Sequence, residues 1–189
     1  MIPKLKMYVG PMFSGKSTRL IQQVERYKIA KKNIVCFKPA MDTRYTLEGF
    51  IVTHNEIHVP CYLVNSCDDI LKLYYEKNEE RMINAVAIDE AFMIDNISKA
   101  CLSLVYDEKI DVLISSIDMS SSLNAFSEIS TLMCHATHIE KCKAVCTMCG
   151  DDASYTMRKS NKEDIVEIQV GGEDMYEARC LAHHSGLDF

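Results

Sequence analysis

Residues 10–17 carry the pattern G-x-x-x-x-G-K-[ST], which is typical of loops that bind phosphate groups. The pattern comprises Gly10, Pro11, Met12, Phe13, Ser14, Gly15, Lys16 and Ser17, and Thr18 follows directly. Successive backbone N–H groups in such a loop form a concave array of donors, to which the N-terminus of a following helix adds its positive end. We expect Lys16 to reach the β- and γ-phosphates and the Ser17 hydroxyl to ligate Mg²⁺. The pattern therefore predicts a site for the triphosphate group of a nucleotide.

Two acidic residues follow an apolar run later in the chain. Residues 85–88 read Ala-Val-Ala-Ile and lead directly into Asp89 and Glu90. Beside a phosphate loop, Asp89 fits the coordination shell of Mg²⁺, and Glu90 fits a general base that accepts a proton from a nucleophile. The pair alone is also compatible with an ordinary solvated strand end. The presence of the phosphate loop favours the catalytic interpretation.

Four residues near the C-terminus have the spacing of a zinc site. Cys146 and Cys149 form a Cys-x-x-Cys pair, and Cys180 and His183 form a Cys-x-x-His pair. Two such pairs complete a tetrahedral Zn²⁺ site, and four protein ligands leave no position for water, so we expect a structural metal. A redox-active Cys-x-x-Cys is the rival hypothesis, although it leaves the second pair unexplained. His184 is an alternative fourth ligand.

The elements that position these residues alternate between strand and helix patterns. Apolar runs predict strands at residues 5–9, 34–37, 57–64, 85–88 and 112–117. Helical periodicity indicates three helices. The first begins at Ser17, the second follows a capping box formed by Ser66 and Asp69, and the third begins near Ile97. Strands that alternate with helices indicate an α/β fold with a parallel sheet. Ligands of such sheets bind beyond the carboxyl ends of the strands, where the phosphate loop, the acidic pair and the loop around Asp42 would converge.

The pattern changes after about residue 140. Short alternating strands are predicted at residues 143–146, 155–158 and 165–170, joined by turns that carry Cys, Asp and Gly. We therefore divide the chain into a nucleotide-binding α/β domain, residues 1–140, and a small β-rich zinc-binding domain, residues 141–189. Gly171 and Gly172 would let the backbone approach a ligand, although a hairpin turn is the simpler interpretation.

Composition narrows the class of protein further. The chain has 189 residues, a hydrophobic fraction of 48% and a net charge of −6, so it can bury a sizeable core and is not suited to general nucleic-acid binding. We find neither a signal-peptide pattern nor a run of about 18 apolar residues, and we expect no membrane anchor. The nine cysteines are an odd set, which indicates reduced thiols in the cytoplasm, and Cys36 and Cys101 fit packed core positions.

Taken in order, the motifs resemble those of the type II thymidine kinases over nearly the whole chain. The matching segments are residues 10–18, Asp42-Thr-Arg-Tyr, Ile-Asp-Glu-Ala at 88–91, the Cys146 pair, and Gly-Gly-x-Asp-x-Tyr at 171–176. The resemblance implies a P-loop, RecA-like sheet flanked by helices, with a zinc-binding appendage and a lasso loop. It implies ATP as co-substrate and transfer of its γ-phosphoryl group to the 5′-hydroxyl of thymidine, in nucleoside salvage for DNA synthesis.

The same resemblance assigns roles to individual residues. Glu90 corresponds to the general base, Lys16 and Ser17 to the phosphate and magnesium contacts, and Asp42 and Arg44 to positions beside the reacting phosphate. The family's lasso loop closes over the base and holds it largely through main-chain groups. The positions that correspond to the nucleoside pocket are Met12, Ser121, Phe126, Glu167, Ile168, Gln169, Val170, Gly171 and Tyr176. The resemblance also implies a homotetramer or a homodimer.

Several residues depart from the family pattern. Phe92 and Met93 stand where the family usually has Gln-Phe, and Ser121 stands where a base-contacting aromatic residue is expected. Residues 122–124 read Ser-Leu-Asn in place of a basic stretch, and His183 replaces the cysteine of many members, which zinc accepts readily. These departures leave the phosphate residues intact, fall at positions that bear on nucleoside selectivity and favour a divergent viral member of the family.

Two other functions use the same motifs. A P-loop ATPase with a structural zinc ribbon would employ Glu90 to orient water instead of a sugar hydroxyl. ADP release that depends on an acceptor separates the kinase from this ATPase. A zinc-ribbon interaction module on a nucleotide-gated switch would require Glu90 to be dispensable.

Overall fold

The structure is a computed structural model that describes residues 2–42, 49–52, 57–159 and 171–184. Its central sheet has six strands in the order β5-β2-β6-β7-β1-β8, and each neighbouring pair runs parallel. The strands are β1 (Leu5–Val9), β2 (Ile34–Pro39), β5 (Tyr62–Val64), β6 (Ala85–Ile88), β7 (Asp111–Ser116) and β8 (His138–Lys141). This parallel sheet confirms the predicted α/β class.

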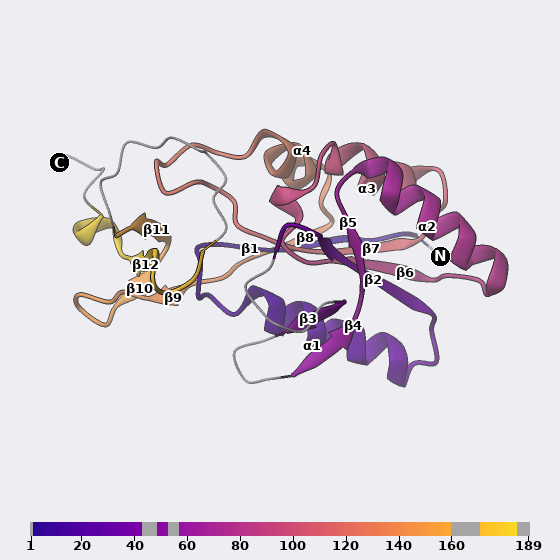
Figure 1. Cartoon of the computed structure of the whole chain (residues 1–189), viewed down its shortest axis with the longest axis horizontal. Helices are drawn as coiled ribbons and strands as arrows, with labels where there is room; N and C mark the ends of the chain where they lie inside the picture. The colour runs from indigo at the N-terminus through magenta and orange to yellow at the C-terminus, as the bar shows by residue number, and fades with distance from the viewer. Residues whose placement is uncertain (1, 43–48, 53–56, 160–170, 185–189) are drawn as a thin grey trace.

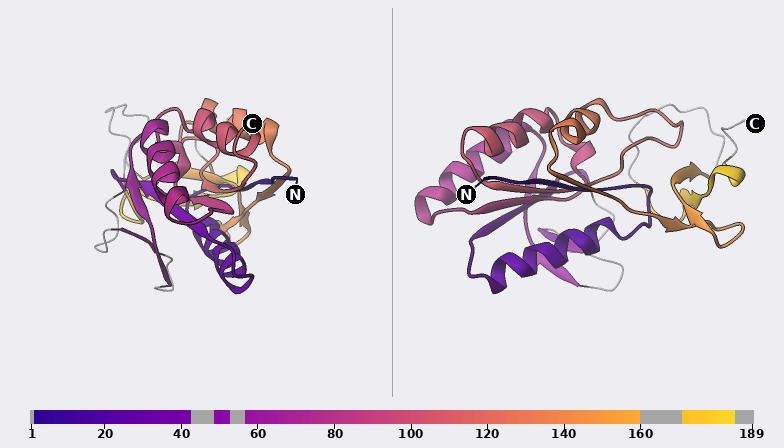
Figure 2. Two further views of the ribbon diagram at one scale, coloured as in Figure 1. Left: turned by 90° about the vertical axis from the view of Figure 1, so that its right-hand side faces the viewer. Right: turned by 180° about the vertical axis from the view of Figure 1, so that it is seen from behind.

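Helices cover both faces of the sheet (Figures 1 and 2). The described α-helices are α1 (Lys16–Ile29), α2 (Cys67–Glu80), α3 (Ile97–Tyr106) and α4 (Ser127–His135). Strand side chains alternate between the faces, so in β1 Met7 packs with the cluster under α2, α3 and α4, whereas Tyr8 packs with Leu20 of α1. The sheet therefore has a hydrophobic core on each side.

The two best-predicted helices begin as their sequences indicate. Helix α1 starts where Gly15 takes a left-handed conformation, with φ of 73°, and its buried residues Leu20, Ile21 and Val24 recur at helical spacing. Helix α2 has the predicted capping box, in which the Ser66 side chain accepts a hydrogen bond from the Asp69 backbone.

The segment predicted as one strand at residues 57–64 is in fact two strands. The first, β4 (His58–Pro60), pairs antiparallel with β3 (Phe50–Val52) in a separate hairpin that packs against α1. The second, β5, joins the edge of the main sheet beside β2. The backbone N–H of Cys61 still donates to the Gly49 carbonyl at 2.8 Å, and the chain then passes directly into β5.

Residues 144–159 and 171–184 form a small β-rich appendage at the end of the sheet farthest from the N-terminus (Figure 1). It contains the antiparallel pair β9 (Ala144–Val145) and β10 (Asp152–Ala153), and the pair β11 (Tyr155–Arg158) and β12 (Tyr176–Arg179). The predicted strand at residues 165–170 lies outside the described residues. The division of the chain at residue 140 remains a prediction.

Two cysteines predicted to pack in the core are buried there. Cys36 lies under α1, and Cys101 of α3 has no exposed surface. Burial raises the pKa of the Cys36 thiol to about 12 and also raises that of Cys101, so both remain neutral. Among the helices described, none is long and apolar enough to cross a membrane.

Candidate active site

The phosphate loop connects β1 to α1 at the carboxyl end of the sheet. Gly10 has a φ of 147°, and a Cβ placed on it would lie 2.3 Å from the carbonyl oxygen of Cys142. Cys142 in turn donates its backbone N–H to Val9 at 2.7 Å. Only glycine fits between the loop and the segment that follows β8, which explains why the pattern begins with this residue.

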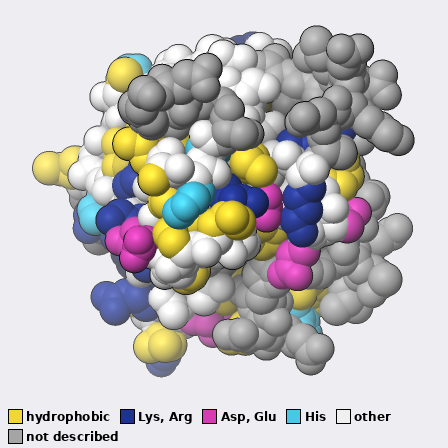
Figure 3. Space-filling model, turned by 90° about the vertical axis from the view of Figure 1, so that its left-hand side faces the viewer, with side chains coloured by type: hydrophobic (Ala, Val, Ile, Leu, Met, Phe, Trp, Pro, Cys, Tyr) yellow, Lys and Arg dark blue, Asp and Glu magenta, His cyan; other side chains and the backbone are white. Residues whose placement is uncertain are grey.

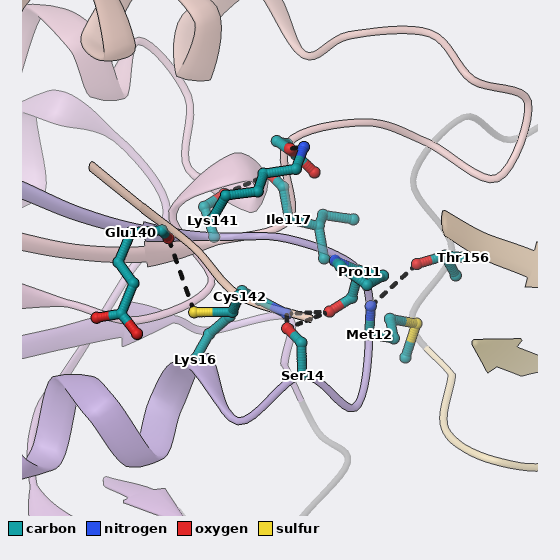
Figure 4. A network of polar contacts seen from close by, with 11 residues as sticks. Pro11, Met12, Ser14, Lys16, Ile117, Glu140, Lys141, Cys142 and Thr156 are labelled. Atoms are coloured by element: carbon teal, nitrogen blue, oxygen red, sulfur yellow. Dashed lines mark hydrogen bonds and ion pairs between the residues drawn. The ribbon is translucent and has the colours of Figure 1, made fainter. Parts of the chain in front are cut away.

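Lys16 is buried at the start of α1 and is held by the loop itself. Its Nζ atom donates to the Pro11 carbonyl at 2.6 Å and lies 3.5 Å from Ser14 Oγ, which also donates to the Pro11 carbonyl (Figure 4). The ammonium group therefore points into the concave side of the loop. An incoming phosphate offers stronger, charged acceptors than the Pro11 carbonyl and can take over these donors.

The acidic pair at the end of β6 lies beside the loop. Asp89 accepts a hydrogen bond from Ser17 Oγ at 2.9 Å, and its backbone N–H donates to Phe37 of the neighbouring strand at 3.0 Å. A serine hydroxyl and a carboxylate in contact are hard oxygen donors of the kind that Mg²⁺ accepts, so the residues fit the predicted magnesium site. The structure thus joins two residues that are 72 positions apart.

Glu90 follows Asp89 in a conformation unusual for this residue type. Its φ and ψ are 49° and 44°, and it begins the short 3₁₀ helix η1 (Ala91–Met93), whose Met93 donates its N–H to the Glu90 carbonyl. The residue is 7% exposed and lines the same cavity as Lys16. Left-handed residues other than glycine cost energy and often occur at functional sites, so the conformation supports a functional role for this carboxylate.

One cavity of about 370 Å³ brings most of the predicted phosphate site together. The residues of the site predicted from the sequence that line this cavity are Met12, Phe13, Ser14, Gly15, Lys16, Ser17, Thr18, Asp42, Asp89 and Glu90. Asp42 is buried where β2 ends, and its backbone carbonyl accepts from Lys38 Nζ at 3.4 Å. Arg44 lies outside the described residues, so its predicted position beside the phosphate remains a prediction.

Sequence reasoning missed several groups that line this cavity. Lys38 is a buried cation at the carboxyl end of β2, and the hairpin strand β3 contributes residues 50–52 as one wall. The sequence did contain a signal for Lys38, because a lysine next to Pro39 at the end of an apolar run lies where a strand of the sheet ends. Gly172 and Glu173 also reach the cavity from the appendage. Gly172 opens a turn, because its carbonyl accepts from the Met175 N–H at 3.1 Å, and approach of this backbone to a ligand remains a prediction.

The predicted nucleoside residues are more widely spread. Phe126 packs against Phe92 with ring centroids 5.0 Å apart, and Ser121 lies in the same loop after β7. Tyr176 begins β12 opposite Arg158, and Gly171 precedes it. Within the described lining of the cavity, only Met12 of this predicted set is present. Residues 167–170 lie outside the described residues, and the nucleoside assignments remain predictions.

The four predicted zinc ligands lie together in the appendage. Their ligand atoms are all within 4.8 Å of one another. Cys149 Sγ is 3.8 Å from Cys180 Sγ, Cys180 Sγ is 3.2 Å from His183 Nδ1, and Cys146 Sγ is 3.9 Å from the same nitrogen. Zn–S bonds of about 2.3 Å in a tetrahedron place sulfur atoms roughly 3.8 Å apart, so the cluster fits the ion.

Local hydrogen bonds favour the thiolate form of one candidate ligand, Cys146. Burial alone would raise the pKa of the Cys146 thiol, but backbone N–H groups of Cys180, Met148 and Cys149 lower it to about 6. The exposed side chains of Met148 and Leu181 flank the ligands, and Figure 3 shows hydrophobic side chains beside a histidine at this end of the molecule.

His184 occupies a different position from its neighbour His183. Its side chain is buried, and its Nε2 atom donates to the Thr156 carbonyl at 3.3 Å. It is not part of the described cluster of candidate ligands. The structure therefore favours His183 over His184 as the fourth ligand.

Comparison with known proteins gives a consistent family. The model of the family described as "Thymidine kinase" matches residues 3–184. The thymidine kinase of Pseudothermotoga lettingae is 33% identical over 180 residues, which are 95% of this chain and 94% of the relative. Thymidine kinases of Aster yellows witches'-broom phytoplasma and Onion yellows phytoplasma are each 32% identical over 188 residues, 97% of this chain and 88% of the relative. A viral origin of the chain remains a prediction.

Proposed function

This chain belongs to the thymidine kinase family, and from that premise we propose which residues carry its reaction. The reaction is the ATP-dependent phosphorylation of thymidine, in which the γ-phosphoryl group passes to the 5′-hydroxyl. We propose that residues 10–18, together with Asp42 and Arg44, bind the phosphates of ATP. The observation that carries the proposal is the cavity where Lys16, Asp89 and Glu90 meet.

We propose Glu90 as the general base. As the 5′-oxygen of thymidine forms a bond to the γ-phosphorus, its proton passes to the Glu90 carboxylate. The bond from that phosphorus to the bridging β–γ oxygen breaks, and ADP leaves with the electron pair. A carboxylate fixed at the end of a buried strand loses little freedom in this step, because the sheet has already set its position.

Lys16 is proposed to stabilise the charge of the transferring group. In this structure its ammonium group is satisfied by the Pro11 carbonyl and Ser14, and bound phosphate would replace that carbonyl. The interaction becomes stronger as negative charge shifts toward the leaving β–γ oxygen, which lowers the barrier and not only the dissociation constant.

Two metals complete the proposal. Mg²⁺ held at Ser17 and Asp89 would supply positive charge at the phosphate oxygens. Zn²⁺ held by Cys146, Cys149, Cys180 and His183 would be structural, because all four positions are protein ligands.

For the acceptor, we propose a pocket that contains Met12, Ser121, Phe126 and Tyr176, with residues 167–171 closing over the base. This assignment is supported by the motif resemblance. The aromatic pair of Phe92 and Phe126 lies next to the Glu90 turn, and the Phe92 backbone N–H donates to Ser116 Oγ at 3.2 Å.

The assembly and its compartment are proposed from the family resemblance and from the cysteines. We propose a homotetramer or a homodimer, supported by the family resemblance, and light scattering on the purified chain tests it. We also propose a cytoplasmic enzyme, because all nine cysteines are unbridged thiols and such thiols persist in a reducing compartment. Cell fractionation of the native protein tests the compartment.

The role of Glu90 is tested by the variant Glu90→Gln. We expect kcat to fall about 10²- to 10⁴-fold while ADP affinity changes little, because a base acts in the transition state. Glu173→Gln is the matched control, since Glu173 is another carboxylate that lines the cavity. Unchanged turnover in Glu90→Gln would remove the residue from this role. ADP release at the same rate with and without thymidine would instead support an ATPase.

A further inference from the structure

The phosphate loop is bonded directly to the appendage. The backbone N–H of Met12 donates to Thr156 Oγ1 at 3.0 Å, a contact between residues 144 positions apart (Figure 4). Thr156 lies in β11 and is 4% exposed. An amide in the middle of a phosphate loop is thus used here as an anchor to the appendage.

The next residue of the loop packs into the core of the appendage. Phe13 has a φ of 64° and contacts a cluster that includes Cys146, Ala153 and Ala178, with Cys180 at its margin. Two of these residues are proposed zinc ligands. Consecutive residues of the loop are therefore held by the appendage, one through a hydrogen bond and one through apolar packing.

Thr156 is linked in turn to both halves of the metal cluster. Its carbonyl accepts from His184 Nε2 at 3.3 Å, next to the proposed ligand His183. In the pair of strands β11 and β12, Thr156 lies opposite Ala178. The Ala178 carbonyl accepts at 3.1 Å from the backbone N–H of Thr147, which lies between the two cysteines of the Cys-x-x-Cys pair. Each step of this path is a short contact between described residues.

We propose that metal binding in the appendage and nucleotide binding in the phosphate loop are energetically coupled, with Thr156 as the positioning residue and Phe13 as its apolar support. The coupling rests on the zinc and phosphate sites proposed above. A metal ion that fixes the turns around Thr156 also fixes the loop, so that less conformational freedom is lost when the phosphates bind. Linkage requires the reciprocal effect, so bound nucleotide holds the zinc more tightly by the same factor.

The experiment uses zinc-loaded, full-length enzyme and does not need a stable metal-free form. The rate of zinc release to a zinc-selective chromogenic chelator is measured with and without saturating Mg-ADP, and no thymidine is present. The proposed contact stabilises the zinc-bound state and is lost as the ligands separate, so the coupling is expected in the release step. We expect ADP to slow the release in the wild type by about fivefold, the effect of one hydrogen bond of about 1 kcal/mol. Titration calorimetry of ADP gives its dissociation constant for the same zinc-loaded samples.

Two substitutions at one position separate the hydrogen bond from packing. Thr156→Val keeps the shape but removes the hydroxyl, and Thr156→Ser keeps the hydroxyl. We expect the effect of ADP on zinc release to shrink toward one and ADP to bind about fivefold more weakly in Thr156→Val, whereas Thr156→Ser retains both properties. Circular dichroism of each variant checks that the fold is kept.

The outcomes distinguish failure of the coupling from failure of its premises. Zinc release that is equally fast with and without ADP, in a wild type that binds both, overturns the coupling and leaves the proposed function standing. Retention of the full effect in Thr156→Val overturns the role of Thr156. A wild type that binds no zinc, or no ADP, overturns the proposed sites and the coupling with them.

Discussion

Gly10→Ala is the substitution whose effect can be worked out most directly from the structure. The new methyl group would lie 2.3 Å from the Cys142 carbonyl oxygen and 3.1 Å from its carbon. The first distance is more than 1 Å inside the ~3.5 Å at which non-bonded atoms attract each other. The clash is with backbone, so the side chain cannot rotate away, and the phosphate loop or the segment after β8 must move.

The cost has two parts. A backbone at φ of 147° is strained for alanine by about 1–3 kcal/mol, and overpacking of a tight contact costs about 1–3 kcal/mol more. We therefore expect the free energy of unfolding to fall by about 4 kcal/mol. In a chain of 189 residues, this loss lowers Tm by about 8–16 °C.

Gly15→Ala is the matched control in the same loop. Gly15 also has a left-handed φ, of 73°, but the nearest atom to its added Cβ is the flexible end of Arg19 at 3.7 Å. Its cost is therefore the backbone strain alone, about 1–2 kcal/mol. Thermal unfolding followed by circular dichroism compares the two, with ADP affinity as a second readout for Gly10→Ala. Equal Tm losses in the two variants would refute the steric argument.

Three further substitutions have clear expected outcomes. Lys16→Ala should abolish measurable turnover while circular dichroism shows an unchanged fold, because a buried cation aimed at the phosphates is lost without a packing role. Ser66→Ala should lower the free energy of unfolding by about 1 kcal/mol in urea titrations. In the same capping box, the backbone N–H groups of Asn65 and Ser66 donate to the Asp69 carboxylate and lower its pKa below 3.8. The stability that the ionised carboxylate adds is therefore present above pH 3.8 and is lost as the pH falls through the lowered pKa. Cys180→Ser, or removal of zinc with a chelator, should lower Tm, since the four candidate ligands form one site. Metal analysis should find one zinc ion per chain in the wild type and less in Cys180→Ser.

The parts of the fold that were predictable have local causes. Strand β1, the phosphate loop and helix α1 follow one another along the chain, and their hydrophobic spacing, glycines and cap signals are all short-range. The grouping of the four candidate zinc ligands was predictable for a related reason, because a Cys-x-x-Cys pair and a Cys-x-x-His pair have metal-ligand spacing that can be read before the fold is known. The acidic pair was predictable because parallel strands end at one edge of the sheet.

The parts that sequence reasoning missed depend on contacts between distant segments. Helix α4 and strand β8 were not predicted, because the exposed residues His138 and Ile139 give β8 no apolar signature and its only described partner is β1. Strand β4 was merged with β5 in the prediction at residues 57–64, and no strand was predicted at residues 50–52, which form a wall of the cavity. The pairing of β3 with β4 and the packing of the pair on α1 are contacts between distant segments. Nothing in the local sequence around Thr156 predicts its bond to Met12.

The conformation of Glu90 shows how the sheet and the site depend on each other. A left-handed glutamate costs about 1–3 kcal/mol and persists only if its surroundings leave no alternative. Those surroundings are visible: Asp89 is tied to β2 through Phe37, Phe92 is tied to Ser116 at the end of β7, and Met93 closes the turn onto the Glu90 carbonyl. The strain is therefore carried by the buried strands on both sides of β6, which gain their stability from the two hydrophobic cores. A proposed base held in this way cannot relax away from the cavity without breaking contacts in the sheet, so its position is set before any substrate arrives.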